Sequence, residues 1–320
     1  MKIRAKIKSE FKSKTPVKVP SKSIISLLNS LYVTRKFSQV RIGKMLGVQG
    51  NTVRRWLDRC DIPVRNRYES VSLSLSKSES KSFSGNSVEK AYLIGIRCGD
   101  LSAQKHGRKI RIAITTTHSA MLTLFNSLFE KYAKIGSYPK YDKTRKRYLT
   151  CVYCDLDGSF DFLIGKADRI PKWILNNAAY FYSFLAGYFD AEGCISIDRY
   201  RNVQFIIKSC DKGILCDLRN GLDKMGFDLH LYLVKKADGI SYNKDYWYLG
   251  TGNRSQITSL LGMIKPRHAE KLVKARLLNR KFSVTEVEKV RRRIKDDIIE
   301  TMKEAEVRYS ESHKTVNILI

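Results

Sequence analysis

Two acidic residues occupy matching places in this sequence, 92 positions apart. Asp100 follows the segment "YLIGIRCG", and Glu192 follows the similar segment "FLAGYFDA". Both segments contain two small residues four positions apart, which would share one helical face: Gly95 and Gly99, and Gly187 and Ala191. Helices that present small residues to each other can pack very closely. The spacing therefore predicts a helix pair at whose end Asp100 and Glu192 meet.

Two carboxylates at one point, beside the negative ends of two helix dipoles, repel each other. A divalent cation relieves this repulsion, and Mg²⁺ prefers hard oxygen ligands. Beside a polyanion, such a site could bind two metal ions, activate water and stabilise the charge that develops during phosphodiester hydrolysis. A lone acid near a helix end is usually solvated, but its recurrence favours a site. We predict that Asp100 and Glu192 bind Mg²⁺ or another divalent cation and act in catalysis.

Each of the two segments begins a longer unit of similar order. A strand-like stretch follows the predicted helix, and then come an amphipathic helix, further strand-like stretches and a short helix with a proline. The units cover residues 88–177 and 178–281. Two copies predict an α+β fold with pseudo-twofold symmetry in one chain, which we expect to be a monomer. Such symmetry suits an approximately palindromic duplex.

The charge of the chain points to a polyanionic partner. Its 320 residues include 60 Lys and Arg but only 31 Asp and Glu, a net charge of +29. Nucleic acid is the leading partner and a membrane surface the second. No segment approaches the roughly 20 apolar residues of a membrane span, and the start lacks a secretory signal. We therefore expect no membrane partner. Seven scattered cysteines suit a reducing compartment, so we also expect a cytoplasmic protein.

Residues 21–69 are predicted to form an all-α helix-turn-helix domain. Gly43 is small enough for two helices to cross closely, Gly47 supplies the turn, and Val40, Ile42 and Leu46 are expected in the core. The exposed side of the second helix carries side chains that can bond base edges or phosphates. The predicted DNA-binding residues are Gln49, Asn51, Thr52, Arg54, Arg55 and Arg59.

Three further segments lie outside these domains. Residues 1–20 are lysine-rich and are predicted to be a basic flexible arm, and residues 70–87 are predicted to be a serine-rich linker. Residues 282–320 are predicted to form a helix and tail, with Ser283 and Glu286 as a capping box. An apolar stripe would dock this helix on the domain: Val287, Val290, Ile294, Ile298 and Met302.

The repeated segments resemble the motif of the LAGLIDADG homing endonuclease family, in its single-chain form with two motifs. "LAGYFDAEG" at residues 185–193 is a close match, and "LIGIRCGDL" at residues 93–101 keeps the first glycine and the acid. The resemblance implies two αββαββα units whose four-stranded sheets form a saddle on DNA. It also implies that Asp100 and Glu192 bind divalent metal, with the carbonyls of Gly99 and Ala191, and cut both strands.

The same resemblance implies a basic residue near the acids, after the second strand pair of each unit. Lys265 stands at that place in the second unit, and Arg169 or Lys172 in the first. Such a cation could stabilise charge in the transition state. The polar residues Thr116 and Ser209, at predicted strand ends, could order water.

The first motif departs from the family pattern, because Leu101 replaces its final glycine and Arg97 occupies an unusual place. Arg97 could bind the neighbouring acids or point to solvent. Two functions other than cleavage of double-stranded DNA therefore stay open. One is a non-catalytic DNA-binding regulator on the same scaffold, and the other is an RNA-binding maturase that acts on intron RNA.

Overall fold

The computed structural model describes residues 22–66, 69–70, 80–239 and 243–317. The chain divides into two compact units, Met1–Lys77 and Ser78–Ile320. The predicted arm at residues 1–20 and residues 71–79 of the predicted linker lie outside the described residues.

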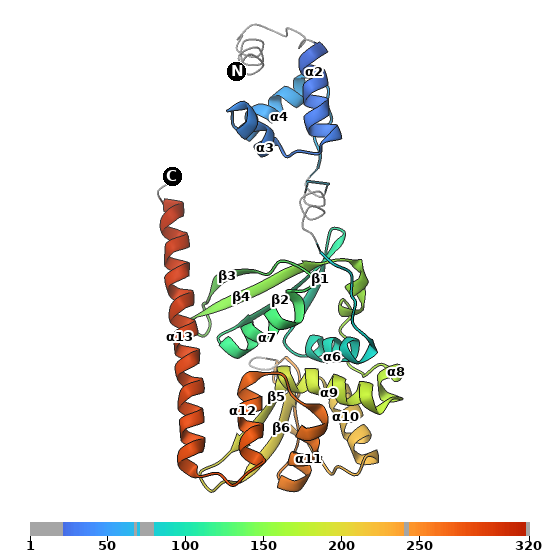
Figure 1. The fold of residues 1–320 in the computed structure, drawn as a ribbon, viewed down its shortest axis with the longest axis vertical. Helices are drawn as coiled ribbons and strands as arrows, with labels where there is room; N and C mark the ends of the chain where they lie inside the picture. The colour runs from blue at the N-terminus through green and yellow to red at the C-terminus, as the bar shows by residue number, and fades with distance from the viewer. Residues whose placement is uncertain (1–21, 67–68, 71–79, 240–242, 318–320) are drawn as a thin grey trace. The chain divides into compact units, whose positions relative to one another are not determined.

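The N-terminal unit is a small helical domain (Figure 1). It contains α2 (Lys22–Leu28), the π-helix η1 (Asn29–Thr34), α3 (Gln39–Leu46) and α4 (Gly50–Arg59). The side chain of Ser38 accepts a hydrogen bond from the amide of Arg41 and begins α3, while Gly47, in the left-handed conformation at φ 67°, ends it. A Cβ atom on Gly43 would lie 2.5 Å from the carbonyl oxygen of Val48, so the close crossing needs glycine.

The core of this unit differs from the prediction at one position. Ile42 is fully buried and Leu46 nearly so, but Val40 is 61% exposed and the prediction that it is buried was wrong. Val40 lies instead against the backbone of Gly50, whose missing side chain leaves room for the start of α4. Ile42 and Leu46 are four residues apart and share one face of α3, whereas Val40 is two residues from Ile42 and therefore lies on another side of the helix.

The C-terminal unit contains the same arrangement twice, as predicted. The first repeat runs through α6 (Ser87–Cys98), β1 (Ser102–His106), β2 (Lys109–Thr116), α7 (Ser119–Phe129), β3 (Gly136–Asp142), β4 (Arg147–Leu156), the 3₁₀-helix η2 (Gly158–Leu163) and α8 (Lys172–Leu175). The second runs through α9 (Ala178–Glu192), β5 (Gly193–Ile197), β6 (Val203–Ser209), α10 (Lys212–Lys224), β7 (His230–Lys235), β8 (Tyr246–Thr251), α11 (Arg254–Ile264) and α12 (Ala269–Leu278).

Two four-stranded antiparallel sheets result, with the equivalent orders β1-β2-β4-β3 and β5-β6-β8-β7. The fold class is α+β, which confirms the prediction. The helices α6 and α9 lie side by side between the two sheets (Figure 1). Because side chains alternate along a strand, one face of each sheet builds the core and the other is left for solvent or a ligand. In β2, for example, Ile110, Ile112 and Ile114 are buried while Arg111 and Thr115 face the other way.

The end of the predicted linker belongs to the first repeat. Ser80 pairs with Ala133 in an isolated β-bridge, and the amide of Lys81 donates to the carbonyl of Tyr132 at 2.7 Å. The ring of Phe83 packs edge-on against Phe160 at a centroid distance of 5.3 Å. Residues 80–86 therefore pack on the first repeat and are not part of a flexible linker. The prediction of a flexible linker up to residue 87 was wrong over this stretch.

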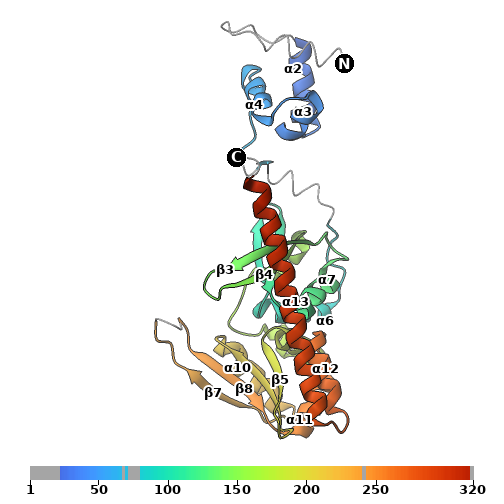
Figure 2. The same ribbon diagram turned by 90° about the vertical axis from the view of Figure 1, so that its left-hand side faces the viewer.

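A long helix, α13 (Val284–Asn317), runs beside both sheets (Figures 1 and 2). The predicted capping box is present, since the amide of Ser283 donates to Glu286 Oε2 at 2.8 Å and the amide of Glu286 donates to Ser283 Oγ at 3.2 Å. Although α13 has 34 residues, no described helix combines the length and apolarity of a membrane span.

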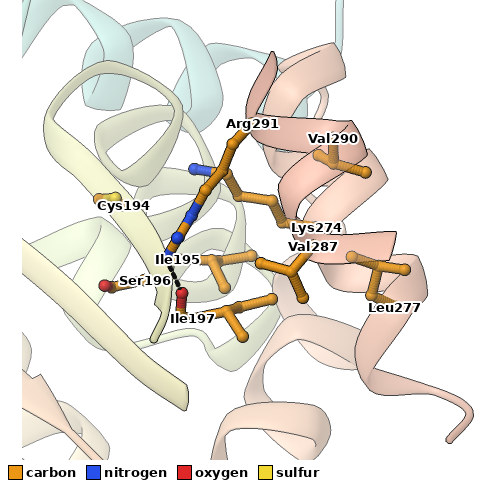
Figure 3. Close-up of a pocket in the computed structure, with 9 residues that line it drawn as sticks. All are labelled: Cys194, Ile195, Ser196, Ile197, Lys274, Leu277, Val287, Val290 and Arg291. Carbon is orange, nitrogen blue, oxygen red and sulfur yellow. Dashed lines mark hydrogen bonds between the residues drawn. The ribbon is translucent and has the colours of Figure 1, made fainter. Parts of the chain in front are cut away.

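The two ends of α13 contact different repeats. Near its start, Val287 and Val290 face Ile195 and Ile197 of β5 across a small cavity of about 100 Å³, and the guanidinium of Arg291 donates to the Ile197 carbonyl (Figure 3). Near its end, the ring of Tyr309 lies 5.4 Å from that of Tyr148 in β4. Arg308 also donates to the carbonyl of Ser137 in β3 at 3.2 Å. One helix therefore joins both repeats.

Candidate active site

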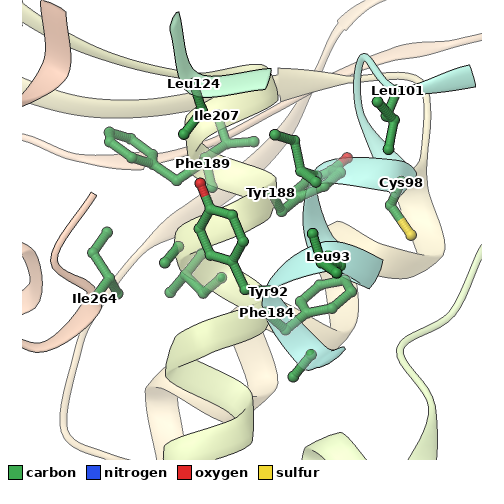
Figure 4. Packing of buried hydrophobic residues seen from close by; sticks show 14 of the residues in the cluster. Tyr92, Leu93, Cys98, Leu101, Leu124, Phe184, Tyr188, Phe189, Ile207 and Ile264 are labelled. Carbon is green, nitrogen blue, oxygen red and sulfur yellow. The ribbon is translucent and has the colours of Figure 1, made fainter. Parts of the chain in front are cut away.

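The two motif helices pack through glycine. A Cβ atom on Gly95 would lie 2.1 Å from the carbonyl oxygen of Phe184, and one on Gly187 would lie 2.1 Å from that of Tyr92. No side chain fits at such distances, so the backbones touch because both residues are glycine. The tyrosines and phenylalanines beside this contact are fully buried, as Tyr92, Phe184 and Tyr188 show in Figure 4.

This contact predicts a sharp difference between two glycines in helices. Alanine raises intrinsic helix propensity by about 1 kcal/mol over glycine, so Gly262→Ala in α11, where a Cβ would meet nothing within 4 Å, should stabilise the protein. Gly187→Ala should instead lower the free energy of unfolding by about 1–3 kcal/mol, the usual cost of overpacking. Chemical denaturation of both variants checks this, and equal stabilisation by both would contradict the close approach.

The acids lie at the end of this helix pair. A Cβ atom on Gly99 would lie 2.3 Å from the Cβ of Ala191 and 3.4 Å from Oε1 of Glu192. Asp100 follows Gly99 directly, so the structure brings Asp100 and Glu192 to one place. Helix α9 ends at Glu192, and Gly193 continues in extended conformation as the first residue of β5. A side chain at Gly193 would collide with the ring of Phe189, so this glycine provides space for packing.

The ionised forms of the two carboxylates are disfavoured in the folded protein, because both groups are partly buried and they lie close together. Partial burial, and next the charge of Asp100, raise the pKa of Glu192 to about 7. Removal from water also raises the pKa of Asp100, although its side chain keeps a solvent-exposed edge and the charges of Lys271 and His118 oppose the shift. Within the described part of the chain, no hydrogen bond or ion pair to either carboxylate is formed.

These features fit a divalent cation with few protein ligands. No group of three or more His, Cys, Asp or Glu among the described residues could enclose a metal ion. Two carboxylates near backbone carbonyls suit Mg²⁺, because Mg²⁺ keeps several of its waters and takes one or two carboxylates plus phosphate oxygens. Asp100 and Glu192 would hold such an ion, and the carbonyls of Gly99 and Ala191 stand next to them in the chain.

The basic residue beside the acids is Lys271 rather than the predicted Lys265. Lys265 is exposed, at the left-handed C-cap of α11, and lies outside the cavity that Asp100 lines. Lys271 of α12 lines this cavity of about 370 Å³, and its Nζ donates to the carbonyl oxygens of Phe189 and, at 2.6 Å, Asp190. Burial lowers the pKa of Lys271 to about 8.

In the first repeat, a different lysine faces the acids. The charge of Lys166 lowers the pKa of both Asp100 and Glu192, and its Nζ lies 3.2 Å from Oδ2 of Asp211. The predicted alternative Arg169 instead donates two hydrogen bonds to Asp217, at 2.6 and 2.9 Å, and so joins two parts of the fold. Lys172, the other alternative, is the first residue of α8.

Arg97 has a structural role that the sequence left open. Its guanidinium donates to the carbonyls of Leu163 at 2.7 Å and Leu101 at 2.9 Å. It therefore neither pairs with the acids nor points to solvent, and it holds the turn that carries Asp100.

Asp190 is a buried carboxylate whose role sequence reasoning missed. Its side chain has no solvent exposure and accepts hydrogen bonds from the hydroxyl of Tyr92 at 2.7 Å, the amide of Arg267 at 2.7 Å and the amide of His268 at 3.2 Å. It thus ties α9 to α6 and to the start of α12. The sequence does contain a hint of this role. Asp190 stands three residues after Gly187 and therefore lies on the face of α9 that packs against α6.

The surfaces that could contact DNA are polar. On the N-terminal unit, Thr52 is half-buried, and no described carboxylate pairs with the arginines among the exposed predicted residues: Gln49, Asn51, Arg54, Arg55 and Arg59. On the second sheet, the rings of Tyr232 and Tyr248 stack at 4.5 Å, with Lys208 beside them. These two tyrosines border a hollow of about 500 Å³ that Gln204 and Arg219 also line.

Comparisons with known proteins give one family match and several similar solved structures. Residues 182–264 match the family model described as a LAGLIDADG-like domain. No curated protein sequence matches the chain. Solved structures with similar folds include the homing endonuclease I-DmoI in complex with DNA and Ca, at 18% identity over 56% of this chain and 89% of that chain, TM-score 0.40.

Two further similar structures are the homing endonuclease I-WcaI bound to its DNA recognition sequence and the N-terminal LAGLIDADG domain of DUF199/WhiA. The first has 15% identity over 62% of this chain and 90% of that chain, with a TM-score of 0.43. The second has 20% identity over 63% and 94%, with a TM-score of 0.39.

Proposed function

We propose that this chain, which carries a LAGLIDADG-like domain over residues 182–264, is a metal-dependent endonuclease that cuts both strands of a long double-stranded DNA site. The observation that carries the proposal is the site at Asp100 and Glu192. Two carboxylates without hydrogen-bond partners in the described part of the chain are forced together by glycine packing at the junction of two equivalent repeats. The repulsion between the two carboxylates destabilises the free protein, and a bound cation would relieve this repulsion.

The proposed mechanism divides the work between the ion and the chain. Bound Mg²⁺ would supply positive charge at the phosphate and at the departing oxygen and would favour ionisation of water. Asp100 and Glu192 hold it there, and Lys271 and Lys166 add fixed positive charge on either side. Pre-arranged charge of this kind lowers the barrier because it need not reorganise during the reaction.

DNA binding would use both units of the chain. The excess of 29 positive charges attracts phosphates without regard to sequence. The outer faces of the two sheets present alternating polar side chains on either side of the acids, in a pseudo-twofold arrangement that matches the symmetry of a duplex. The helix α4, with Arg54, Arg55 and Arg59 exposed, would add contacts to base edges or to the DNA backbone.

Selection from a randomised or genomic DNA library, with and without Mg²⁺, tests the proposal. We expect a long preferred site that is bound under both conditions and cut on both strands only with the cation. Binding without cutting at any divalent ion would favour the non-catalytic regulator. Tighter binding to structured intron RNA than to any duplex DNA would favour the maturase.

The contribution of the N-terminal unit is measurable as a salt dependence. Removal of residues 1–69 should weaken DNA binding and flatten the plot of log affinity against log salt, because each neutralised phosphate contributes a slope of about −0.9. Arg54→Gln with Arg55→Gln in the full chain should reduce the slope by about 2 if both contact phosphates. Binding isotherms over a series of salt concentrations measure this, and an unchanged slope in both variants would show that the unit does not contact DNA.

A further inference from the structure

Two pairs of polar side chains join the first repeat to the second beside the acids, and the two pairs differ chemically. On one side, Nδ1 of His118 at the start of α7 lies 2.8 Å from Oε1 of Glu270 in α12. On the other side, Lys166 lies 3.2 Å from Asp211 at the start of α10.

His118 and Asp211 occupy equivalent places in the two repeats. Each is the N-cap residue of the helix that follows the second strand, α7 or α10. Each also donates its backbone amide to a hydroxyl two residues earlier, at the end of that strand. The hydroxyl of Thr116 accepts from His118 at 3.0 Å, and that of Ser209 accepts from Asp211 at 3.1 Å. The pseudo-twofold relation therefore places an imidazole in one half of the site and an ion-paired carboxylate in the other.

His118 is accessible from the cavity beside Asp100. It lines the same cavity of about 370 Å³ as Asp100 and Thr116, and 42% of its side chain remains exposed. Lys271 of α12 lines this cavity as well. Asp211, in contrast, forms an ion pair with Lys166, and its charge contributes to the raised pKa of Glu192.

The partner of His118 determines which ring nitrogen is free. Burial would raise the pKa of Glu270, but the hydrogen bond from His118 and nearby positive charge, that of Lys274 included, hold this pKa below its usual value. Glu270 is therefore a carboxylate, which can only accept a hydrogen bond. Nδ1 of His118 must carry the proton that it shares with Glu270, so Nε2 of the neutral ring is left as an acceptor.

We propose that His118, oriented by Glu270, is the general base of one half of the site and that the other half has no equivalent base. The inference rests on the proposed nuclease function and deepens it. Nε2 of His118 takes a proton from the attacking water while its oxygen bonds to phosphorus and the bond from phosphorus to the 3′ oxygen breaks. The departing oxygen takes a proton from solvent, and the imidazolium later releases its own proton to solvent. One water is consumed, and a 5′ phosphate and a 3′ hydroxyl remain.

Strand-resolved cleavage of an end-labelled duplex separates this role from a structural one. His118→Asn places an amide nitrogen where Nδ1 stands, so the bond to Glu270 can persist while the base is lost. We expect His118→Asn and His118→Ala to slow the cutting of one strand by about 100-fold, the lower range for general-base catalysis. The cutting of the other strand should be unchanged.

The outcomes are distinguishable from failure of the proposed function. If the wild-type chain cuts neither strand with any divalent ion, the nuclease proposal fails and this inference with it. If the wild-type chain cuts and His118→Asn cuts both strands normally, His118 only bridges the repeats and the inference alone is overturned. Equal slowing of both strands would also overturn it, since it would indicate one shared role.

A second measurement needs neither metal nor DNA. Long-range nitrogen–proton NMR spectra of the full chain, labelled at histidine, report which ring nitrogen carries the proton. We expect the signals of His118, identified by their loss in His118→Asn, to show a protonated Nδ1 and a bare Nε2 in the neutral ring. A protonated Nε2 would overturn the proposed base, whatever the cleavage assays show.

Discussion

Replacement of Asp100 by Asn and Glu192 by Gln in one chain should abolish DNA cutting and leave DNA binding intact. The proposed cation site depends on two negative charges, and both substitutions keep the shape of the side chain while they remove its charge. Metal ions contribute several kcal/mol of transition-state stabilisation, so the loss should reach at least about a thousandfold in rate. Plasmid cleavage measures the rate, and binding of the target duplex without metal measures the affinity.

This double variant should also be no less stable than the wild-type chain. Glu192 has its pKa raised to about 7 by burial and by Asp100, so its ionised form is disfavoured in the folded state at neutral pH. A neutral amide removes that repulsion, and the thermal midpoint should hold or rise. Asp296→Asn, the same change at an exposed position on α13, serves as the matched control and should alter neither cutting nor binding. Cutting by the double variant at the wild-type rate in Mg²⁺ would remove both acids from the mechanism.

Removal of the Asp190 side chain should produce the largest loss of stability in the C-terminal unit. Asp190→Ala leaves the hydroxyl of Tyr92 and two backbone amides buried without an acceptor. Loss of one partner from a buried, charged network typically costs about 3–5 kcal/mol. For a unit of this size we expect a fall of roughly 10 °C in the melting temperature.

The control for this prediction is an exposed aspartate. Asp223→Ala, at an exposed position of α10, should change the free energy of unfolding by no more than about 0.5 kcal/mol. Because Asp190 lies two residues before Glu192, Asp190→Ala should also impair cutting at temperatures where the protein remains folded. A variant that retained wild-type stability would show that the three donors find other acceptors.

The helix pair and the acids were predictable because their signals are local and repeated. Gly95 and Gly187 are each followed four residues later by another small residue, and this period alone defines a face. The repeat then supplies a second, independent copy of the same pattern. The convergence of Asp100 and Glu192 followed from helix geometry, without knowledge of the rest of the fold.

The residues around the acids were less predictable because they come from distant segments. Lys265 stands beside a proline at the expected point in the sequence, but the left-handed turn there leaves it on the surface. Lys271, six residues later, reaches the carbonyls at the end of α9 only because Asp190 holds the start of α12 in place. The contact between His118 and Glu270 joins residues 152 positions apart, and no local period reports such a pair.

The docked segment at residues 80–86 shows another limit of sequence reasoning. Serine dominates the composition of that stretch, so its average character predicted a flexible segment. One aromatic residue decides the outcome, since Phe83 packs against Phe160 and Phe162. Composition describes a segment as a whole, whereas docking depends on single side chains.

The helix α13 makes the two halves of the C-terminal unit depend on each other. At about 1.5 Å per residue, its 34 residues form a rod roughly 50 Å long. Its start is anchored by Arg291 at β5, and its end by Tyr309 against β4. Unfolding of either repeat would remove the contacts of one end of α13. We therefore expect the whole unit to unfold in a single cooperative step. The helix α13 should also resist any motion of the two repeats that would separate Asp100 from Glu192.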